Sequence, residues 1–323
     1  MEKISWGIIG CGDVAEVKSG PAFQQCKNSE LVAVMRRNGA KAKDFAERHK
    51  VPNWYDNAEE LLARIDINAV YIATPPASHL KYTLQAIAAG KDIYLEKPMT
   101  ISENEAIKIS ETLKNSSSKL TVAHYRRKLP AFLKVKELLA NKEIGEIRVA
   151  DIQILRSHKN DLIAESDDNW RVDPSVSGGG LFHDLAPHQL DLMYHYFGDI
   201  ESVKSFSDNQ SNLNSTDDVV NGIIHFKNGV QFRGVWSFSV SEESQLDRCI
   251  IYGSQGNIEF PFFGDQVILN TERGKQVFEF ESIPHVQQPM IQETVNYFLG
   301  TNNNPCTAEE GLVVMKLLDA FTQ

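Results

Sequence analysis

The sequence contains few cysteines: 4 among 323 residues, at Cys11, Cys26, Cys249 and Cys306. They lie far apart, and no two stand at the CxxC spacing that is typical of zinc sites and redox disulfides. We therefore expect neither a disulfide framework nor a bound metal. Sparse, scattered cysteines suit a reducing compartment, so the prediction for location is the cytoplasm.

Positive charge and long apolar runs are also lacking. Lys and Arg number 33 against 43 Asp and Glu, which gives a formal net charge of −10 at pH 7. Such an acidic chain is poorly suited to bind nucleic acid or acidic membranes. No apolar run approaches the roughly 20 residues of a membrane span, and the N-terminus lacks the apolar segment of a signal peptide. We expect neither nucleic acid nor membrane as a partner.

The first 122 residues alternate short apolar segments with helical ones. The expected strands are Ile4–Ile9, Glu30–Met35, Asn68–Thr74, Asp92–Pro98 and Lys119–His124. Between them lie helical patterns, one of which opens at Ser102 with Glu105 three residues on, a capping box. Alternation of this kind is typical of a parallel, doubly wound sheet of the α/β class.

After about His124 the pattern changes. Several alternating segments follow, and two of them flank Asn228–Gly229, a strong signal for a hairpin. We predict a second domain of the α+β class, built on an open, mostly antiparallel sheet. The expected domains are 1–123 and 124–323. Bulky apolar residues alternate in Val230–Val240, and we interpret them as an uncovered apolar face that pairs two copies of the chain.

The segment "GCGDVA" follows the first expected strand and opens a helix. In that context Gly10 permits the tight turn, and Gly12 lets the backbone approach a pyrophosphate, with Asp13 and Val14 at the helix N-terminus. Ala15 permits close packing of the helix on the strand. We predict a dinucleotide site; the alternative is a tight turn in an α/β domain that binds no nucleotide.

The end of the second strand indicates which dinucleotide is bound. An NAD site usually has an acidic residue there to hold the ribose 2′-hydroxyl, but this chain has Arg36 and Arg37. Guanidinium groups suit a 2′-phosphate through paired hydrogen bonds. The prediction is NADP in preference to NAD, and the alternative is two solvated arginines at a strand end.

Three further segments carry a family resemblance. They are "TPPASH" at Thr74–His79, "YLEKP" at Tyr94–Pro98 and "GGGLFHDLAPHQLDL" at Gly178–Leu192. Together with the glycine turn they resemble the glucose–fructose oxidoreductase/inositol dehydrogenase (Gfo/Idh/MocA) family nearly end to end. The resemblance implies a Rossmann domain for dinucleotide binding, then an α+β domain for substrate binding and oligomerisation. It also implies NAD or NADP as cofactor, sugars or polyols as substrates, and dimers or tetramers.

The resemblance assigns roles residue by residue. Lys97 matches the family's catalytic lysine, and Asp184 and His188 match its acidic residue and its histidine. Residues implied at the cofactor are Thr74, Pro75, His79, Glu96 and Lys97 itself. Residues implied near the substrate are Arg126, Arg127, Trp170 and Arg171. The stretch Asn169–Gly180 also resembles 1,5-anhydrofructose reductases.

One departure from the family concerns the segment between Asp184 and His188. It reads Leu-Ala-Pro, where relatives usually carry a glycine, and this change puts the local backbone in question. The loops Lys159–Val176 and Asp208–Asp217 are expected to set substrate specificity.

The expected chemistry is a hydride transfer with a proton on His188, whose side chain has an ordinary pKa of about 6.5. Asp184 stands four residues earlier and shares its helix face. Lys97 is expected to polarise the reacting oxygen. Three alternatives stay open: an ordinary helical Asp–His pair, an NAD-dependent glycoside hydrolase of the same fold, and a nucleotide-binding regulator without catalysis.

Overall fold

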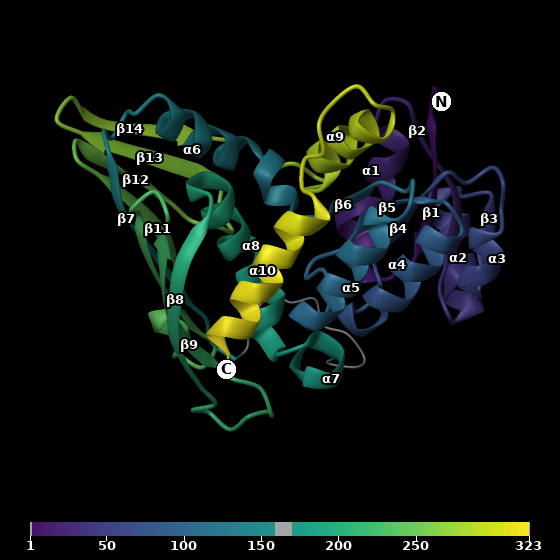
Figure 1. Ribbon diagram of the computed structural model, residues 1–323, viewed down its shortest axis with the longest axis horizontal. Coiled ribbons are helices and arrows are strands. Elements are labelled where there is room, and N and C mark those ends of the chain that lie inside the picture. Colours follow the sequence, from purple (N-terminus) through teal and green to yellow (C-terminus); the bar gives the residue numbers. More distant parts are fainter. Residues whose placement is uncertain (1, 159–169, 323) are drawn as a thin grey trace. The chain divides into compact units, whose positions relative to one another are not determined.

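The computed structural model describes residues 2–158 and 170–322 (Figure 1). The chain forms two compact units: unit 1 comprises Met1–Tyr125 with Ile283–Met315, and unit 2 comprises Arg126–Ser282 with Lys316–Gln323. These bounds differ from the predicted domains 1–123 and 124–323 chiefly because residues 283–315 return to unit 1. The signal for this return was absent from the sequence pattern, since the segment follows the strands of unit 2 directly.

Unit 1 is built on a six-stranded parallel sheet in the order β3-β2-β1-β4-β5-β6. This is the strand order of a Rossmann fold, and it confirms the predicted fold class. Its strands are β1 (Ile4–Ile9), β2 (Ser29–Met35), β3 (Asn53–Tyr55), β4 (Ala69–Ile72), β5 (Asp92–Leu95) and β6 (Leu120–Val122). The short β3 was not predicted, because its partly exposed "NWY" lacks an apolar run.

Helices cover both faces of this sheet. Trp6, Tyr71 and Tyr94 lie on one face and meet Phe23 of α1 (Gly20–Gln25) or Phe298 of α9 (Gln288–Phe298). The connecting elements are a π-helical turn η1 (Ala15–Ser19), α2 (Gly39–His49), α3 (Ala58–Leu62), a 3-10 turn η2 (Pro76–Ser78), α4 (His79–Ala88) and α5 (Glu103–Lys114). Strands buried on both faces explain the continuous apolar runs of the sequence.

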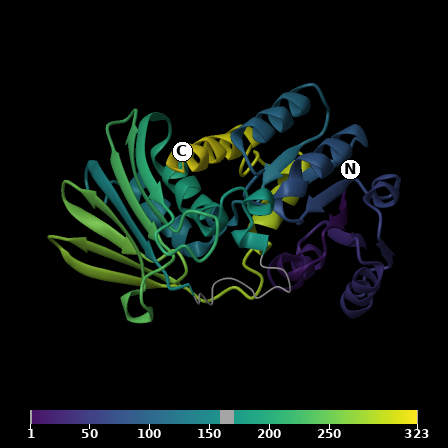
Figure 2. The same cartoon turned by 90° about the horizontal axis from the view of Figure 1, so that it is seen from below.

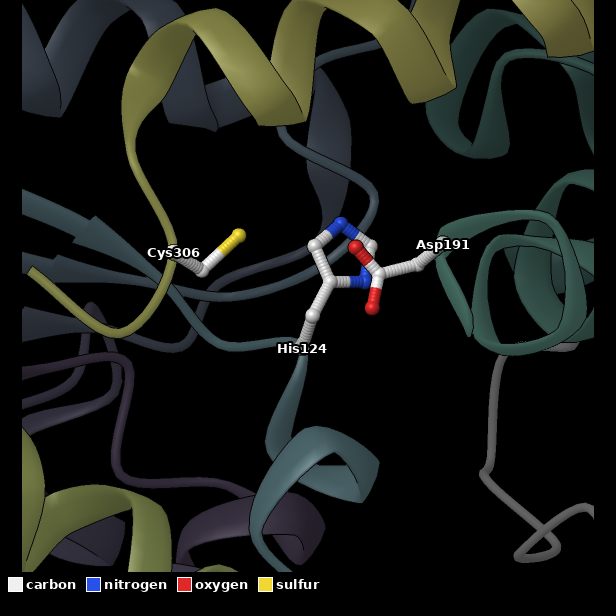
Figure 3. Close-up of side chains that lie close together, drawn as sticks. All are labelled: His124, Asp191 and Cys306. Carbon is white, nitrogen blue, oxygen red and sulfur yellow. The ribbon is translucent and has the colours of Figure 1, made fainter. Parts of the chain in front are cut away.

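The returning segment closes the edge of the sheet beside β6. The backbone N–H of Val122 donates to the carbonyl of Cys306 at 3.0 Å, and the Asn304 side chain bonds Thr121 and Leu120. Figure 3 shows Cys306 on the loop before α10 (Ala308–Phe321) and His124 on the segment that leaves β6. A covered edge cannot pair with a foreign strand.

Unit 2 is built on an eight-stranded sheet in the order β14-β13-β12-β11-β7-β10-β9-β8. All pairs are antiparallel except β7 with β10, which confirms a mostly antiparallel sheet. The strands are β7 (Ile147–Leu155), β8 (Ile200–Asp208), β9 (Val219–Phe226), β10 (Gln231–Ser237), β11 (Leu246–Gly253), β12 (Gly256–Phe260), β13 (Gln266–Thr271) and β14 (Gly274–Glu279). Gly229, at a φ of 87°, turns the predicted hairpin between β9 and β10.

Helices cover one face of this second sheet, as both views show (Figures 1 and 2). The helical elements of unit 2 are η3 (Tyr125–Lys128) from Arg126 on, α6 (Pro130–Ala140), η4 (Trp170–Val172), α7 (Pro174–Ser177), α8 (Gly180–Phe197) and η5 (Glu242–Ser244), with the end of α10. Trp236 of β10 packs edge-on against Phe182 of α8 and Phe321 of α10.

That packing corrects the interpretation of Val230–Val240. Its bulky residues Phe232 and Trp236 are buried under the helices, 1% and 0% exposed. The opposite face of β10 carries Gln231, Arg233 and Val235 instead. The alternation was predicted correctly, but the apolar residues of this segment form the core of unit 2 and give no argument for a dimer.

Among the described residues no helix has the length and apolarity needed to cross a membrane.

Candidate active site

The turn after β1 has the geometry of a phosphate cradle. Gly10 has a φ of 96°, and a side chain there would lie 2.8 Å from the backbone nitrogen of Thr74. A side chain on Gly12 would meet no protein atom within 4 Å. Gly10 therefore serves the fold of the turn, whereas Gly12 leaves open space beside the backbone. The helix that begins at Asp13 and Val14 directs its first N–H groups, which have no partner within the helix, toward this turn.

Arg36 follows β2 and reaches the same turn. Its Nη1 donates to the carbonyl oxygen of Cys11 at 3.5 Å, and its backbone N–H donates to Tyr55. The side chain is half-buried, while that of Arg37 is exposed. Burial raises the pKa of the Cys11 thiol to about 11, so the turn carries no thiolate that would compete for the guanidinium.

Buried His79 joins two loops at the carboxyl ends of β4 and β5. Its Nε2 lies 2.7 Å from the carbonyl oxygen of Thr74, and its Nδ1 lies 3.0 Å from that of Pro98. Burial lowers the pKa of His79, so the neutral ring donates to one of these carbonyls. His79 thus ties the Thr74–Pro75 loop to the loop that carries Lys97.

Lys97 directly follows Glu96 at the end of β5. Glu96 is 5% exposed, and its Oε2 accepts the backbone N–H of Lys97 at 3.0 Å. Its Oε1 accepts from Tyr71 and from Gln287, each at 2.5 Å. Glu96 was predicted to lie at the cofactor. The structure shows that these hydrogen bonds hold its carboxylate in the core of unit 1.

In unit 2 the structure brings Trp170, Arg171 and Asp184 together. The Nε of Arg171 lies 3.2 Å from Oδ2 of Asp184, and its guanidinium carbon lies 4.6 Å from the Trp170 ring centroid. Residues 159–169, which include part of the predicted specificity loop and Asn169, lie outside the described residues. Within the described part, Arg171 compensates the charge of Asp184, whose side chain is 16% exposed.

His188 lies one helical turn after Asp184 on α8 and is 4% exposed. Helix α8 runs without interruption through Pro187, so the departure from the family pattern does not break the shared face of Asp184 and His188. Because proline has no N–H, the helix forgoes only the bond to the carbonyl of His183. Burial lowers the pKa of His183 to about 4, which keeps that neighbouring imidazole neutral at physiological pH.

Phe263 is a neighbour of His188 that the sequence did not reveal. The two rings are 6.5 Å apart and nearly perpendicular, and the guanidinium carbon of Arg126 lies 4.5 Å from the same Phe263 ring. The Asp247 carboxylate accepts the backbone N–H groups of Phe262 and Phe263 at 2.9 and 2.7 Å, which fixes the loop. Arg126 also donates to the carbonyl of Phe262. A contact over 75 residues leaves no local signal in the sequence.

Arg127 forms a buried ion pair with Asp191. Its Nε and Nη2 lie 2.7 to 3.1 Å from the two carboxylate oxygens, and both side chains are 1% exposed. Figure 3 shows Asp191 projecting from α8. The bidentate pair ties η3 to α8 inside unit 2. The substrate role of Arg127 stays a prediction, and Asp191 is a partner that the sequence did not reveal.

Comparison with known proteins identifies the family. Residues 4–124 match an oxidoreductase family with an NAD-binding Rossmann fold, and residues 132–259 match the GFO/IDH/MocA C-terminal domain. An oxidoreductase of Formosa agariphila is 52% identical over 319 residues, which cover 99% of this chain and 98% of that protein. The chain belongs to the Gfo/Idh/MocA oxidoreductase family. The resemblance drawn from the motifs is thereby confirmed.

One further relative and one crystal structure are similar to this Gfo/Idh/MocA protein. The D-xylose 1-dehydrogenase (NADP(+)) of Hypocrea jecorina is 30% identical over 205 residues, which cover 59% of this chain and 52% of that protein. The crystal structure of an oxidoreductase from Thermotoga maritima has a TM-score of 0.87 at 25% identity, covering 99% of this chain and 96% of that one. The protein is an NAD(P)-dependent oxidoreductase.

The phosphate turn of this Gfo/Idh/MocA protein fits an NAD(P) pyrophosphate. Gly12 provides space beside the backbone, and the adjoining helix start provides N–H donors. The hydroxyl oxygen of Thr74 is buried, and among the described residues it has no hydrogen-bond partner. An orphaned donor at the carboxyl end of a parallel strand is a suitable contact for a dinucleotide, which binds at that edge of a Rossmann sheet.

Proposed function

We propose that this Gfo/Idh/MocA oxidoreductase prefers NADP(H) and transfers a hydride between the nicotinamide and a sugar, polyol or related hydroxy or keto compound. The observation that carries the cofactor preference is the contact between Arg36 and the carbonyl of Cys11. It places a guanidinium beside the phosphate turn, at a strand end where an NAD enzyme usually carries a carboxylate. The NADP(+) in the name of the Hypocrea jecorina relative supports the same preference.

The proposed cofactor residues divide by the part of the dinucleotide that they serve. Gly10, Gly12, Asp13 and Val14 hold the pyrophosphate, and Arg36 and Arg37 hold the 2′-phosphate. Thr74, Pro75 and His79 form the loop along the cofactor. When bound, the nicotinamide supplies or accepts the hydride. Glu96 holds the backbone of Lys97 through its N–H.

The proton chemistry is assigned to the protein's own side chains. His188 takes the hydroxyl proton during oxidation and returns it during reduction, since imidazole changes charge near neutral pH. Lys97 stabilises the negative charge that develops on the reacting oxygen. Asp184, which is paired with Arg171, orients the imidazole of His188 or accepts a hydrogen bond from a substrate hydroxyl. Arg126, Arg127, Trp170 and Arg171 are proposed for the substrate side.

The substrate class rests on chemistry and on relatives. Hydroxyl-rich substrates suit a site that offers carboxylate, guanidinium and aromatic groups together, as Asp184, Arg171 and Trp170 do. The Hypocrea jecorina relative is named for D-xylose. D-xylose, other aldoses and their keto derivatives therefore form the first panel of compounds to assay.

The experiment that tests the function is a steady-state assay of NADPH oxidation and NADP⁺ reduction with this panel. We expect turnover with at least one sugar, and a loss of about 10²- to 10⁴-fold in kcat for Lys97→Ala and for His188→Ala. Lys108→Ala on α5 and His225→Asn on β9 are the matched controls and keep full activity. Full activity of Lys97→Ala and His188→Ala would remove the proposed roles.

We also propose a homodimer through the outer face of the unit 2 sheet. The cross-strand register places Phe206, Ile223, Val149, Tyr252 and Val277 on that face, where they are 36% to 84% exposed. Exposed apolar side chains of this size favour burial against a second copy. Charged side chains such as Arg233 and Lys204 lie between these residues.

Sedimentation at micromolar concentration tests the dimer. We expect a dimer or a higher even oligomer for the native chain and dissociation for Phe206→Asp combined with Ile223→Asp. Leu133→Asp, at a 44% exposed position of α6 away from that face, is the control and keeps the native state of assembly. A native chain that sediments as a monomer contradicts the proposal.

A further inference from the structure

A buried polar network lies in unit 1 behind the loop that carries Lys97. It consists of Tyr71 on β4, Tyr94 on β5, Glu96 and Gln287, and these four side chains are between 0% and 5% exposed. Tyr71 donates to Oε1 of Glu96 at 2.5 Å, and Nε2 of Gln287 donates to the same oxygen at 2.5 Å. The hydroxyl of Tyr94 donates to Oε1 of Gln287 at 3.1 Å. Each bond links residues far apart in the sequence.

The direction of every bond in this network follows from the chemistry. The amide of Gln287 donates from Nε2 to Glu96 and accepts the Tyr94 hydroxyl at Oε1, so its NH₂ lies toward Glu96 and its oxygen toward Tyr94. Burial raises the pKa of Tyr71 and Tyr94 well above the ordinary value, so both phenols keep the protons that they donate. Once Oε1 is occupied by two donors, Oε2 is left to accept the N–H of Lys97 at 3.0 Å.

Gln287 is itself held in place from both sides. Its N–H donates to the carbonyl of Lys18, at 3.4 Å, in the helical turn η1 that follows the phosphate turn. Its carbonyl accepts the N–H of Ile291 at 2.9 Å as α9 begins. Ser19, the last residue of η1, donates to the Tyr71 hydroxyl at 3.1 Å. The network therefore connects the helix after the phosphate turn with the backbone of Lys97.

We infer that Gln287 is a positioning residue for Lys97. Its amide holds Glu96 in the one orientation in which the second carboxylate oxygen can receive the Lys97 N–H, and so it fixes the backbone that carries the lysine. A buried network that is fully paired specifies a single geometry, because each alternative leaves a buried polar group unpaired. This inference rests on the proposed function only in that Lys97 acts on the substrate.

The first test measures hydrogen exchange of the Lys97 backbone amide by NMR. Gln287→Leu removes the amide at nearly constant volume, and we expect exchange at Lys97 to become about tenfold faster or more, which matches the loss of one hydrogen bond. Gln292→Leu on the exposed side of α9 is the matched control and leaves that rate unchanged. An unchanged rate in Gln287→Leu overturns the inference. If that variant does not fold, Tyr71→Phe removes the other donor to Oε1 and carries the same expectation.

A second variant separates positioning from space filling. Gln287→Glu is isosteric but places a second carboxylate against Glu96, and such a pair holds one shared proton at low pH. While the pair holds this proton it restores the hydrogen bond, and once the pH is high enough to remove it the two charges repel. We expect the exchange rate at Lys97, taken relative to the native protein at the same pH, to rise with pH. A ratio that does not depend on pH contradicts a positioning role.

Activity measurements distinguish this inference from the proposed function. With the sugar that turns over best, Gln287→Leu is expected to lower kcat about tenfold with KM changed less than about twofold, since Lys97 acts in the transition state. If Lys97→Ala is fully active, the proposed function fails, and the exchange data still decide the role of Gln287. If Lys97→Ala is inactive while Gln287→Leu matches the native protein in exchange and kcat, only the positioning role fails.

Discussion

The sheet of unit 1 is covered by helices on both faces, whereas the sheet of unit 2 is covered on one face only. Candidate site residues of unit 1 lie in loops at the carboxyl ends of parallel strands, where the backbone itself makes the site. Candidate residues of unit 2 lie on α8 and η4, where the side chains of Arg171 and Asp184 hold one another. The candidate site of unit 1 thus depends on backbone turns, and that of unit 2 depends on pairs of charged side chains. Variants in the two units are therefore expected to differ in their effects on stability and on cofactor affinity.

The largest effect is expected from the buried charge pair of unit 2. Asp191→Asn removes the carboxylate charge that is paired with the buried guanidinium of Arg127, which costs about 3–5 kcal/mol in the free energy of unfolding. Urea unfolding measures this loss. Asp199→Asn is the control: Asp199 pairs with Lys227 on the surface, and its loss changes stability by less than about 0.5 kcal/mol. Equal effects of the two substitutions would mean that burial does not decide the strength of these pairs.

The next largest effect is expected in unit 1, where one substitution changes cofactor affinity but not the free energy of unfolding. Gly12→Ala adds a methyl group that meets no protein atom, so the free energy of unfolding stays within about 0.5 kcal/mol of native. The same methyl group occupies the space proposed for the pyrophosphate, and NADPH affinity falls about 10- to 100-fold. Fluorescence titration and urea unfolding of the same preparation measure both quantities. An alanine variant with native NADPH affinity would refute the cradle.

The smallest effect is a dependence of stability on pH in unit 2. Folding lowers the pKa of His183 from about 6.5 to about 4, so on acidification the unfolded chain takes up this proton first. The stabilising contribution is complete above pH 6.5 and is lost as the pH falls toward 4, at up to about 1.4 kcal/mol per pH unit. His183→Asn should lessen the loss of stability between pH 7 and pH 5 by about 2 kcal/mol in total.

The sequence predicted unit 1 in detail because its elements leave local marks. Ile4–Ile9 forms β1 as expected, and Ser102 caps α5 through the N–H of Glu105. Gly10, which has a positive φ, was also predicted from the sequence, because the turn that requires it is marked by a short glycine motif. The family followed from short motifs whose residues are close in sequence.

Features that depend on distant partners could not be predicted from the sequence. Gln287 reaches Glu96 across 191 residues, and Phe263 reaches His188 from another element. The alternation in Val230–Val240 was visible in the sequence, but the face of β10 that the helices cover was not. A period of two shows which residues share a face of the strand, but it does not show what packs against that face. The candidate roles of Lys97, Asp184 and His188 remain predictions drawn from the family.

The measurement that tests the central claim most directly is a titration of the purified protein with NADPH and, separately, NADH, repeated with Arg36→Asp. We predict that NADPH binds at least tenfold more tightly than NADH, and that Arg36→Asp removes this preference by weakening NADPH alone. Arg273→Asp, which makes the same change of charge at an exposed position of unit 2, preserves the preference. Equal or tighter binding of NADH by the native protein would contradict the claim that Arg36 selects the 2′-phosphate.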